Sequence, residues 1–358
     1  MKAGEKESEA IIDFIKANDD FSIFYHLDGD GITSAAILAQ AIEKLGKRLR
    51  GVRPTNYEDF ENGINLSDFS DTVVICDLQV LESYIPELKT KNLCVIDHHE
   101  VINHAGIIYI NPKMWGDLTY TPCALLTYRL FEKFVPELDW VSAIGLVSDA
   151  GGKENGKWLR EVAGKYGVKL KDDEYLYDNE FGLVASMLNS MTLQYGRDGA
   201  DEALGILLQT KSLNELLANQ KLISANNNAK KEVYQLREDF ENKKEAYGDL
   251  IYFFDVPSIK KRYSSSVITP LSIEKSYYGK ILVFMTRVNG DTMRVNIRAN
   301  GLDVKLPHAL REIFTKIKGN GGGHNPAAGA SIRPQDKDKF KTLFAEEMRK
   351  QLDKRFSS

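Results

Sequence analysis

The chain has 358 residues, of which 43% are hydrophobic and 27% are charged. This composition is typical of a globular protein with a sizeable core, and the length suits two domains rather than one. The net charge of −4 excludes a surface that attracts nucleic acid through overall positive charge, although a bound metal pair and a local basic groove would still permit such a ligand.

The cysteines and the N-terminal residues indicate the compartment. Cys76, Cys94 and Cys123 form no CxxC pair, and the first two lie in apolar runs, as buried thiols do in reducing surroundings. The charged N-terminal residues lack the apolar core of a signal peptide, and no apolar stretch approaches the roughly 18 residues that span a bilayer. The sequence therefore predicts a cytoplasmic protein that does not enter a membrane.

The first half of the chain alternates helix and strand patterns. Apolar residues at helical spacing mark four segments: 5–17, 33–45, about 121–134 and about 141–148. Short apolar runs predict three strands: 21–25, 72–76 and 93–96. Because continuous apolar strands alternate with helices, the first half is predicted to form a parallel sheet covered on both faces.

The second half begins with helical patterns and ends with strands. Helices are predicted at 201–208, 213–222 and 226–247, the last being long and charged, which suits a connector between domains. Strand patterns then follow at 250–256, 280–288 and 292–300, with later helices at 309–318 and 337–352. We therefore predict three parts: an α/β parallel-sheet domain over 1–190, a helical connector over 191–248 and a smaller α+β domain over 249–358.

Acidic and histidine residues follow the predicted strands and apolar segments of the first half. They are His26, Asp28, Asp30, Asp77, Asp97, His98, His99 and Asp149. Ligands of open parallel sheets bind outside the carboxyl ends of the strands, so these side chains are expected to converge on one cleft. Buried carboxylates repel one another unless protons or cations compensate, and oxygen-rich sites with one or two imidazoles suit Mn²⁺ or Mg²⁺ rather than structural zinc. Taken singly, Asp77 and Asp149 are equally well explained as cap or turn residues.

A second group of candidate residues lies towards the C-terminus. Gly321, Gly322 and Gly323 precede His324, and consecutive glycines permit positive φ and expose backbone N–H groups, which predicts a nest for phosphate oxygens. Alone, such a run is more typical of a loop. Arg298 lies on a predicted strand, where it would either clamp a phosphate or lie on a solvated face.

These motifs resemble those of the DHH phosphoesterases across nearly the whole chain. The four N-terminal motifs are matched in order by His26-Leu-Asp28-Gly-Asp30-Gly, Asp77, Asp97-His98-His99 and Asp149. Gly321–His324 resembles the signature of the C-terminal domain in the RecJ-like and nano-RNase-like branch. Arg298 is the loosest match, because it stands in Asn-Ile-Arg where relatives often have Ser-x-Arg.

The resemblance implies two divalent cations, Mn²⁺ before Mg²⁺, and a role for each residue. One cation would be held by His26 and Asp28, the other by Asp30, His98 and Asp149, with Asp77 bridging them. Asp97 would orient a histidine, and His99 would face the scissile phosphate or the leaving group. A neighbouring phosphate would be gripped by Arg298, Gly321, Gly322, Gly323 and His324.

The implied activity is that of a two-metal phosphodiesterase, which hydrolyses single-stranded DNA or RNA, or short oligonucleotides, from an end to release nucleoside monophosphates. Residues 249–358 suffice for the family's C-terminal domain and no more, which favours a minimal enzyme or an archaeal RecJ-like nuclease. Nano-RNase and cyclic-dinucleotide phosphodiesterase remain alternatives. The glycine-histidine motif disfavours a family II pyrophosphatase, and the intact ligand set disfavours a replication scaffold. Cleavage polarity, a homodimer and a replication or repair partner are left open.

Overall fold

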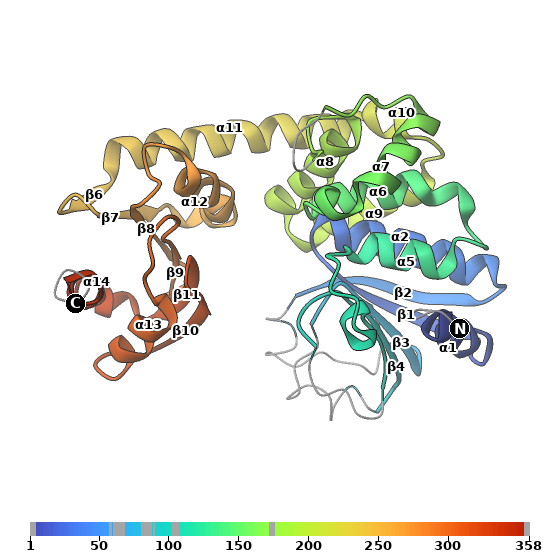
Figure 1. Cartoon of the computed structure of the whole chain (residues 1–358), viewed down its shortest axis with the longest axis horizontal. Coiled ribbons are helices and arrows are strands. Elements are labelled where there is room, and N and C mark those ends of the chain that lie inside the picture. The colour runs from blue at the N-terminus through green and yellow to red at the C-terminus, as the bar shows by residue number, and fades with distance from the viewer. Residues whose placement is uncertain are drawn as a thin grey trace. The chain divides into compact units, whose positions relative to one another are not determined.

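The computed structural model describes residues 5–56, 59, 69–79, 88, 90–101, 107–171 and 176–353. The chain divides into two compact units, Met1–Asn226 and Asn227–Ser358 (Figure 1). The expected three-part division therefore stays a prediction. No helix among the described residues is both long and apolar enough to cross a membrane.

The first unit contains the predicted parallel sheet. Its strands, in spatial order, are β2 (Arg48–Thr55), β1 (Asp20–His26), β3 (Thr72–Cys76), β4 (Asn92–Ile96) and β5 (Ile108–Ile110), and all neighbours are parallel. Both faces of the sheet are buried, because Val74 packs into one hydrophobic cluster while Val73 and Ile75 pack into another. Short strands without polar positions are expected for such a doubly covered sheet.

Helices fill the remainder of the first unit. The α-helices are α1 (Glu5–Lys16), α2 (Gly29–Lys44), α5 (Cys123–Phe131), α6 (Asp139–Ser148), α7 (Gly152–Tyr166), α8 (Glu180–Tyr195), α9 (Arg197–Gln209) and α10 (Leu213–Leu217). Short 3-10 helices are η3 (Pro112–Trp115) and η4 (Pro136–Leu138). Residues of α1, α2, α5 and α6 share one hydrophobic cluster with a face of the sheet.

Several elements of the first unit differ from expectation. The edge strands β2 and β5 were not predicted, because β2 carries Gly51, Pro54 and exposed arginines, which only an edge strand tolerates, and β5 has three residues. Helix α2 begins at Gly29 rather than at residue 33, since the Asp28 side chain caps it by accepting a hydrogen bond from Gly31 N at 3.0 Å. Helix α7 was not predicted either.

The helix expected over 213–222 is two helices. It breaks at Asn219, whose side chain accepts hydrogen bonds from the backbone of Lys221 and Leu222 and so starts α11 (Gln220–Lys243). Helix α11 ends earlier than the expected connector helix, because Glu245–Tyr247 form the short strand β6.

The second unit is built on a mixed sheet of six strands. In spatial order these are β10 (Gly319–His324), β11 (Ala327–Ile332), β9 (Met293–Arg298), β8 (Ile281–Arg287), β7 (Ile251–Val256) and β6 (Glu245–Tyr247). The pair β7–β8 is parallel and the other pairs are antiparallel. The helices are α12 (Ser264–Ile273), α13 (Leu306–Phe314) and α14 (Lys337–Asp353), with short η5 (Ser258–Tyr263) and η6 (Pro334–Asp336).

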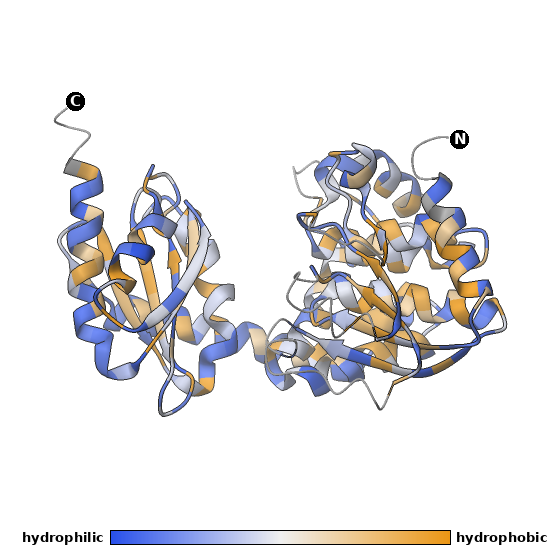
Figure 2. Ribbon diagram, turned by 90° about the horizontal axis from the view of Figure 1, so that it is seen from below, coloured by the Kyte–Doolittle hydropathy of each residue, from blue (hydrophilic) through white to orange (hydrophobic). Residues whose placement is uncertain are grey.

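The two faces of this sheet carry different side chains. Alternate residues of β9, such as Val295 and Ile297, pack with α13 and α14 in one hydrophobic cluster. On the opposite face, Phe240 of α11 packs against Phe254 and Phe284, with ring centroids 5.6 and 5.2 Å apart. Figure 2 shows the hydrophobic colour concentrated along the central strands of this unit. The predicted α+β character is therefore confirmed.

The glycine run is a strand, not a loop. Gly319–His324 pair with Ala327–Ile332 along the whole of β10, and of the three predicted nest glycines only Gly323 has a positive φ, of 129°. The expected nest of consecutive positive-φ glycines is therefore wrong. A β-carbon at Gly321 would lie 2.5 Å from the carbonyl oxygen of Gly329, so glycine is needed there for strand pairing.

Candidate metal centre

The carboxyl ends of three neighbouring strands place the predicted residues at one edge of the sheet. The registers Tyr25↔Cys76 and Cys76↔Ile96 align the ends of β1, β3 and β4. His26, Asp77 and Asp97 are the residues that end β1 or directly follow β3 and β4. The expected convergence is thereby observed.

Two further carboxylates reach this edge from helices. Asp30 lies in the first turn of α2 and is buried; its oxygens accept hydrogen bonds from the backbone of Cys123 at 2.7 Å and of Ala124 at 2.9 Å. These are the first residues of α5, whose N-cap Pro122 offers no capping side chain. Asp30 therefore caps a helix that begins 93 residues later in the sequence. Asp149 arrives from the C-terminal end of α6.

The ligand atoms form three overlapping groups, in each of which they lie within 4.8 Å of one another. The groups are His26/Asp28/Asp77, Asp30/His98/Asp149 and Asp77/His98/His99. Members of the first and second groups are the residues to which the two cations were assigned, and Asp77 and His98 link the groups. The described residues thus include carboxylate and histidine groups that could hold metal ions.

Asp77 presents a different oxygen to each side of the cluster. Its Oδ2 lies 3.6 Å from His26 Nδ1, and its Oδ1 lies 3.2 Å from His98 Nε2. The backbone of Asp77 has φ = 60°, a left-handed conformation that a non-glycine residue adopts at some cost in strain. Such strain is common where the surroundings hold a side chain in a functional position.

The charges of the cluster favour a cation. Burial, together with the neighbouring carboxylates, raises the pKa of Asp30 well above its usual range. Burial also raises the pKa of Asp149 to about 6, because it outweighs the hydrogen bond from Tyr120. Carboxylates that are costly to ionise together become favourable ligands once divalent cations neutralise them.

Thiolate ligation does not contribute to this cluster. Burial raises the pKa of Cys76 and Cys123, and the Cys123 thiol donates a hydrogen bond to the carbonyl oxygen of Ile96 at 3.3 Å. The donor set is therefore carboxylate oxygen and imidazole nitrogen, which fits Mn²⁺ or Mg²⁺ better than structural zinc.

Asp97 and His99 form a separate pair beside the cluster. Asp97 is fully buried and accepts hydrogen bonds from His99 Nδ1 at 2.7 Å and from the Tyr109 hydroxyl at 3.0 Å. The His99 side chain is 39% exposed. The Asn111 side chain donates a hydrogen bond to the backbone carbonyl oxygen of His99 at 3.0 Å. The histidine that Asp97 orients is thus His99, whose Nε2 takes no part in this pair.

Two residues near the cluster, Tyr120 and Asn189, were missed from the sequence. The Tyr120 hydroxyl donates a hydrogen bond to Asp149 Oδ2, and Asn189 of α8 accepts one from Gly29 N at 2.8 Å while donating one to Ser148 Oγ at 3.0 Å. Asn189 thereby joins the start of α2 to the residue before Asp149. No local pattern marks these residues, because their partners lie 29 to 160 positions away in the chain.

Arg298 and His324 of the second unit share one row of the sheet. Ala327 pairs with His324 on one side and with Arg298 on the other, so all three lie on the same face. Burial lowers the pKa of the half-buried Arg298. The guanidinium donates a hydrogen bond to the carbonyl oxygen of Ile297 at 3.0 Å and has no carboxylate partner among the described residues. Arg298, Gly321, Gly322, Gly323 and His324, which are predicted to grip a phosphate, are called the phosphate-binding face below.

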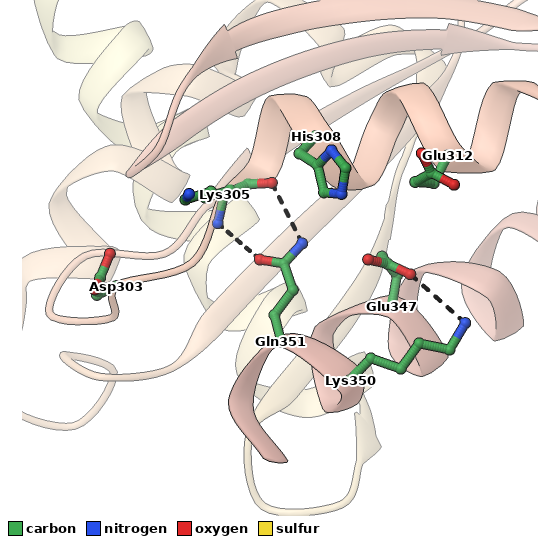
Figure 3. Close-up of a pocket in the computed structure, with 7 residues that line it drawn as sticks. All are labelled: Asp303, Lys305, His308, Glu312, Glu347, Lys350 and Gln351. Carbon is green, nitrogen blue, oxygen red and sulfur yellow. Dashed lines mark hydrogen bonds and ion pairs between the residues drawn. The ribbon is translucent and has the colours of Figure 1, made fainter. Parts of the chain in front are cut away.

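A pocket elsewhere in the second unit does not involve this face (Figure 3). It is lined by Asp303, Lys305, His308, Glu312, Glu347, Lys350 and Gln351. Its lysines are balanced by three carboxylates, and the Gln351 side chain accepts a hydrogen bond from Lys305 N at 2.8 Å. This contact joins the start of α13 to the end of α14 and serves the packing of the two helices.

Models of known protein families match a segment in each unit of the chain. Residues 20–144 match the family model described as the DHH family, N-terminal domain, and residues 261–350 match the DHHA1 domain. No curated protein sequence matches the chain.

Solved structures share the fold. RecJ from Thermus thermophilus in complex with Mn²⁺ is 18% identical with a TM-score of 0.71, and the alignment covers 98% of this chain but 55% of that one. An exonuclease RecJ bound to manganese is 17% identical with a TM-score of 0.71 and coverages of 98% and 95%. CDC45 from Entamoeba histolytica is 12% identical with a TM-score of 0.61 and coverages of 96% and 98%. The chain thus spans about half of the Thermus protein.

Proposed function

We propose that this chain, which belongs to the DHH family and carries a DHHA1 domain, is a metal-dependent phosphodiesterase that removes nucleoside monophosphates from an end of single-stranded nucleic acid. The position of Asp77 is the observation that supports this most strongly. One of its oxygens faces His26 and the other faces His98. A two-metal hydrolytic site requires a carboxylate that serves both cations in this way.

The residues divide into two ligand sets that share Asp77. His26 and Asp28 would hold one cation, and Asp30, His98 and Asp149 would hold the other. Two bound Mn²⁺ or Mg²⁺ ions would lower the pKa of a water molecule and neutralise charge on the phosphate oxygens. The hydrogen bonds to Asp30 and Asp149 fix these carboxylates before any ligand arrives, which reduces the cost of ordering them.

His99 would act on the substrate rather than on a cation. With Nδ1 held by Asp97, its Nε2 is the ring atom that remains to contact a phosphate or the leaving oxygen. The partial exposure of the ring suits this role. The phosphate-binding face of the second unit would hold a further phosphate of the nucleic-acid strand. This favours a nucleotide polymer over a single phosphate ester as the substrate.

The test is hydrolysis of single-stranded DNA and RNA of two, five and twenty nucleotides, labelled at the 5′ or the 3′ end, with Mn²⁺ and with a chelator. We expect metal-dependent release of mononucleotides from one end. Cleavage of the dinucleotides alone would replace the exonuclease by a nano-RNase, and a cyclic dinucleotide assayed beside them tests the remaining alternative. Absence of cleavage of every substrate would contradict the proposal.

A binding role without catalysis is the other class of function that the comparisons raise, since CDC45 shares the fold. The complete set of carboxylates and histidines around Asp77 supports an enzyme instead. Binding of a labelled oligonucleotide in the presence of a chelator separates the two classes. A scaffold would bind without any metal-dependent loss of the label.

A further inference from the structure

Tyr120 contacts two residues of the metal centre at once. Its hydroxyl donates a hydrogen bond to Oδ2 of Asp149, the same oxygen that lies 3.5 Å from His98 Nε2. Its ring meets the His98 ring edge to face, with centroids 5.3 Å apart and planes inclined by 65°. Asp149 and His98 belong to one ligand group with Asp30. Tyr120 thus contacts two members of this group, Asp149 through its hydroxyl and His98 through its ring.

The backbone around Tyr120 is fastened to the segment that follows Asp149. The Asn155 side chain donates hydrogen bonds to the carbonyl oxygens of Tyr120 at 2.8 Å and Gly151 at 3.0 Å. Asn155 is buried and lies at a kink in α7, with φ = −111° and ψ = 17°. A β-carbon at Gly151 would lie 2.5 Å from Pro122, so the two segments pack closely. Ala150, between Asp149 and Gly151, has φ = 53°.

These contacts do not serve the burial of Tyr120. The residue is 40% exposed, so an ordinary core role does not explain why two segments are held together around it. A carboxylate oxygen has two lone pairs, and a donor on one of them leaves the other for a cation.

Building on the proposed function, we propose that Tyr120 is a positioning residue that fixes Asp149 and His98 for the cation held with Asp30. The hydroxyl sets the direction of the Asp149 carboxylate, and the ring limits rotation of the His98 imidazole. Partners of metal ligands typically contribute about 10- to 100-fold to metal affinity. The cation held by His26 and Asp28 lacks these contacts and should be unaffected.

The chain offers a matched control in Tyr166. Its hydroxyl donates a hydrogen bond to Oδ1 of buried Asp139 at 2.6 Å, and the residue is 39% exposed. Asp139 begins α6, whereas Asp149 follows the end of the same helix. Tyr166→Phe therefore removes a similar hydrogen bond far from Asp149. Asp139 lies about 15 Å from Asp149 along α6, because a helix rises 1.5 Å per residue.

The experiment is a titration of the full chain with Mn²⁺, in which free Mn²⁺ is followed by electron paramagnetic resonance. We expect the wild type to bind two ions, and Tyr120→Phe to bind one of them about tenfold or more weakly. Tyr120→Leu, which also removes the ring, should weaken it further, and Tyr166→Phe should match the wild type. Thermal unfolding in a chelator should give similar midpoints for wild type and Tyr120→Phe, which separates positioning from folding.

The outcomes distinguish this proposal from the function on which it rests. If the wild type binds no Mn²⁺, the proposed function fails. If the wild type binds two ions and Tyr120→Phe binds both equally well, the role of Tyr120 is wrong while the function stands. As a second readout, the Mn²⁺ concentration for half-maximal hydrolysis should rise about tenfold in Tyr120→Phe, and kcat at saturating Mn²⁺ should change little. A fall in kcat without a change in the Mn²⁺ dependence would also contradict positioning.

Discussion

The candidate metal centre of the first unit and the proposed phosphate-binding face of the second differ in how the fold holds their side chains. In the metal centre, buried carboxylates such as Asp30 are fixed by hydrogen bonds from distant segments. On the phosphate-binding face, β10 is exposed along its whole length and Arg298 is half-buried. Groups that must meet a reacting phosphorus need fixed positions, whereas groups that hold a neighbouring phosphate need access. The comparison predicts effects on kcat in one region and on KM in the other.

The largest effect is expected from Asp77→Asn. Asparagine tolerates the left-handed backbone at this position better than alanine does, so it is the sharper test. Loss of the proposed bridging carboxylate should remove several kcal/mol of transition-state stabilisation and lower kcat by roughly a thousandfold or more. Steady-state hydrolysis with Mn²⁺ measures this, and circular dichroism should show a folded protein. Retention of more than roughly a tenth of wild-type kcat would exclude a bridging role for Asp77.

A smaller effect of the opposite kind is expected from Arg298→Ala. A charged hydrogen bond contributes about 1.5–3 kcal/mol, so KM should rise roughly 10- to 100-fold while kcat at saturating substrate stays near the wild-type value. Arg333→Ala is the control, because Arg333 is paired with Asp336 outside the phosphate-binding face. If Arg298→Ala lowers kcat alone, the division of roles between the two regions is wrong.

The next prediction concerns how the free energy of unfolding of the first unit, which contains Asp30 and Asp149, depends on pH. The pKa of Asp149 is about 6 in the folded chain and about 3.8 when unfolded. Between these values the metal-free folded protein binds more protons than the unfolded protein, so the free energy of unfolding should fall as pH rises from about 4 to 6. The raised pKa of Asp30 acts in the same direction. The side chain of Asp149 is 30% exposed, so the change should be on the order of 1–2 kcal/mol.

Tryptophan fluorescence measures this change in the first unit, because Trp115, Trp140 and Trp158 all lie there. Urea unfolding at several pH values with a chelator should show the fall. Asp149→Asn should reduce it, and added Mn²⁺ should raise stability most at the higher pH, where the carboxylates are ionised. A metal-free protein that gains stability from about pH 4 to 6 would show that the cluster charges are compensated in another way.

The sequence predicted the convergence of the strand ends better than the strand structure of the glycine run, for a physical reason. Strands that end beside Asp77 or Asp97 indicate a shared edge through their own apolar pattern, and the observed registers follow from it. The links made by Tyr120 and Asn189 leave no such pattern, because they depend on the tertiary packing of α6 and α8. The glycines of β10 were misjudged, since residues without side chains give no periodicity from which to recognise a strand.

The smallest effect on KM is expected within that glycine strand, where two neighbouring glycines form a matched pair. A β-carbon at Gly322 would meet no atom within 4 Å, whereas one at Gly321 would lie 2.5 Å from the carbonyl oxygen of Gly329. Gly321→Ala should therefore lower the free energy of unfolding of the second unit by about 1–3 kcal/mol, as overpacking does. Gly322→Ala should leave the melting temperature unchanged but raise KM about threefold, because its methyl group occupies the surface on which a phosphate would lie.

The two variants distinguish whether the glycines serve strand pairing or substrate binding. Differential scanning calorimetry measures the stability of each variant, and steady-state kinetics measures KM. If Gly322→Ala has the KM of the wild type, the exposed glycine does not touch the substrate, and the run exists to let β10 approach β11. The phosphate-binding face would then consist of Arg298 and His324 alone, and their shared row across Ala327 would be the whole of the contact. If KM rises without loss of stability, the exposed backbone of β10 itself serves binding, in contrast to the metal centre, where hydrogen-bonded side chains such as Asp30 would do so.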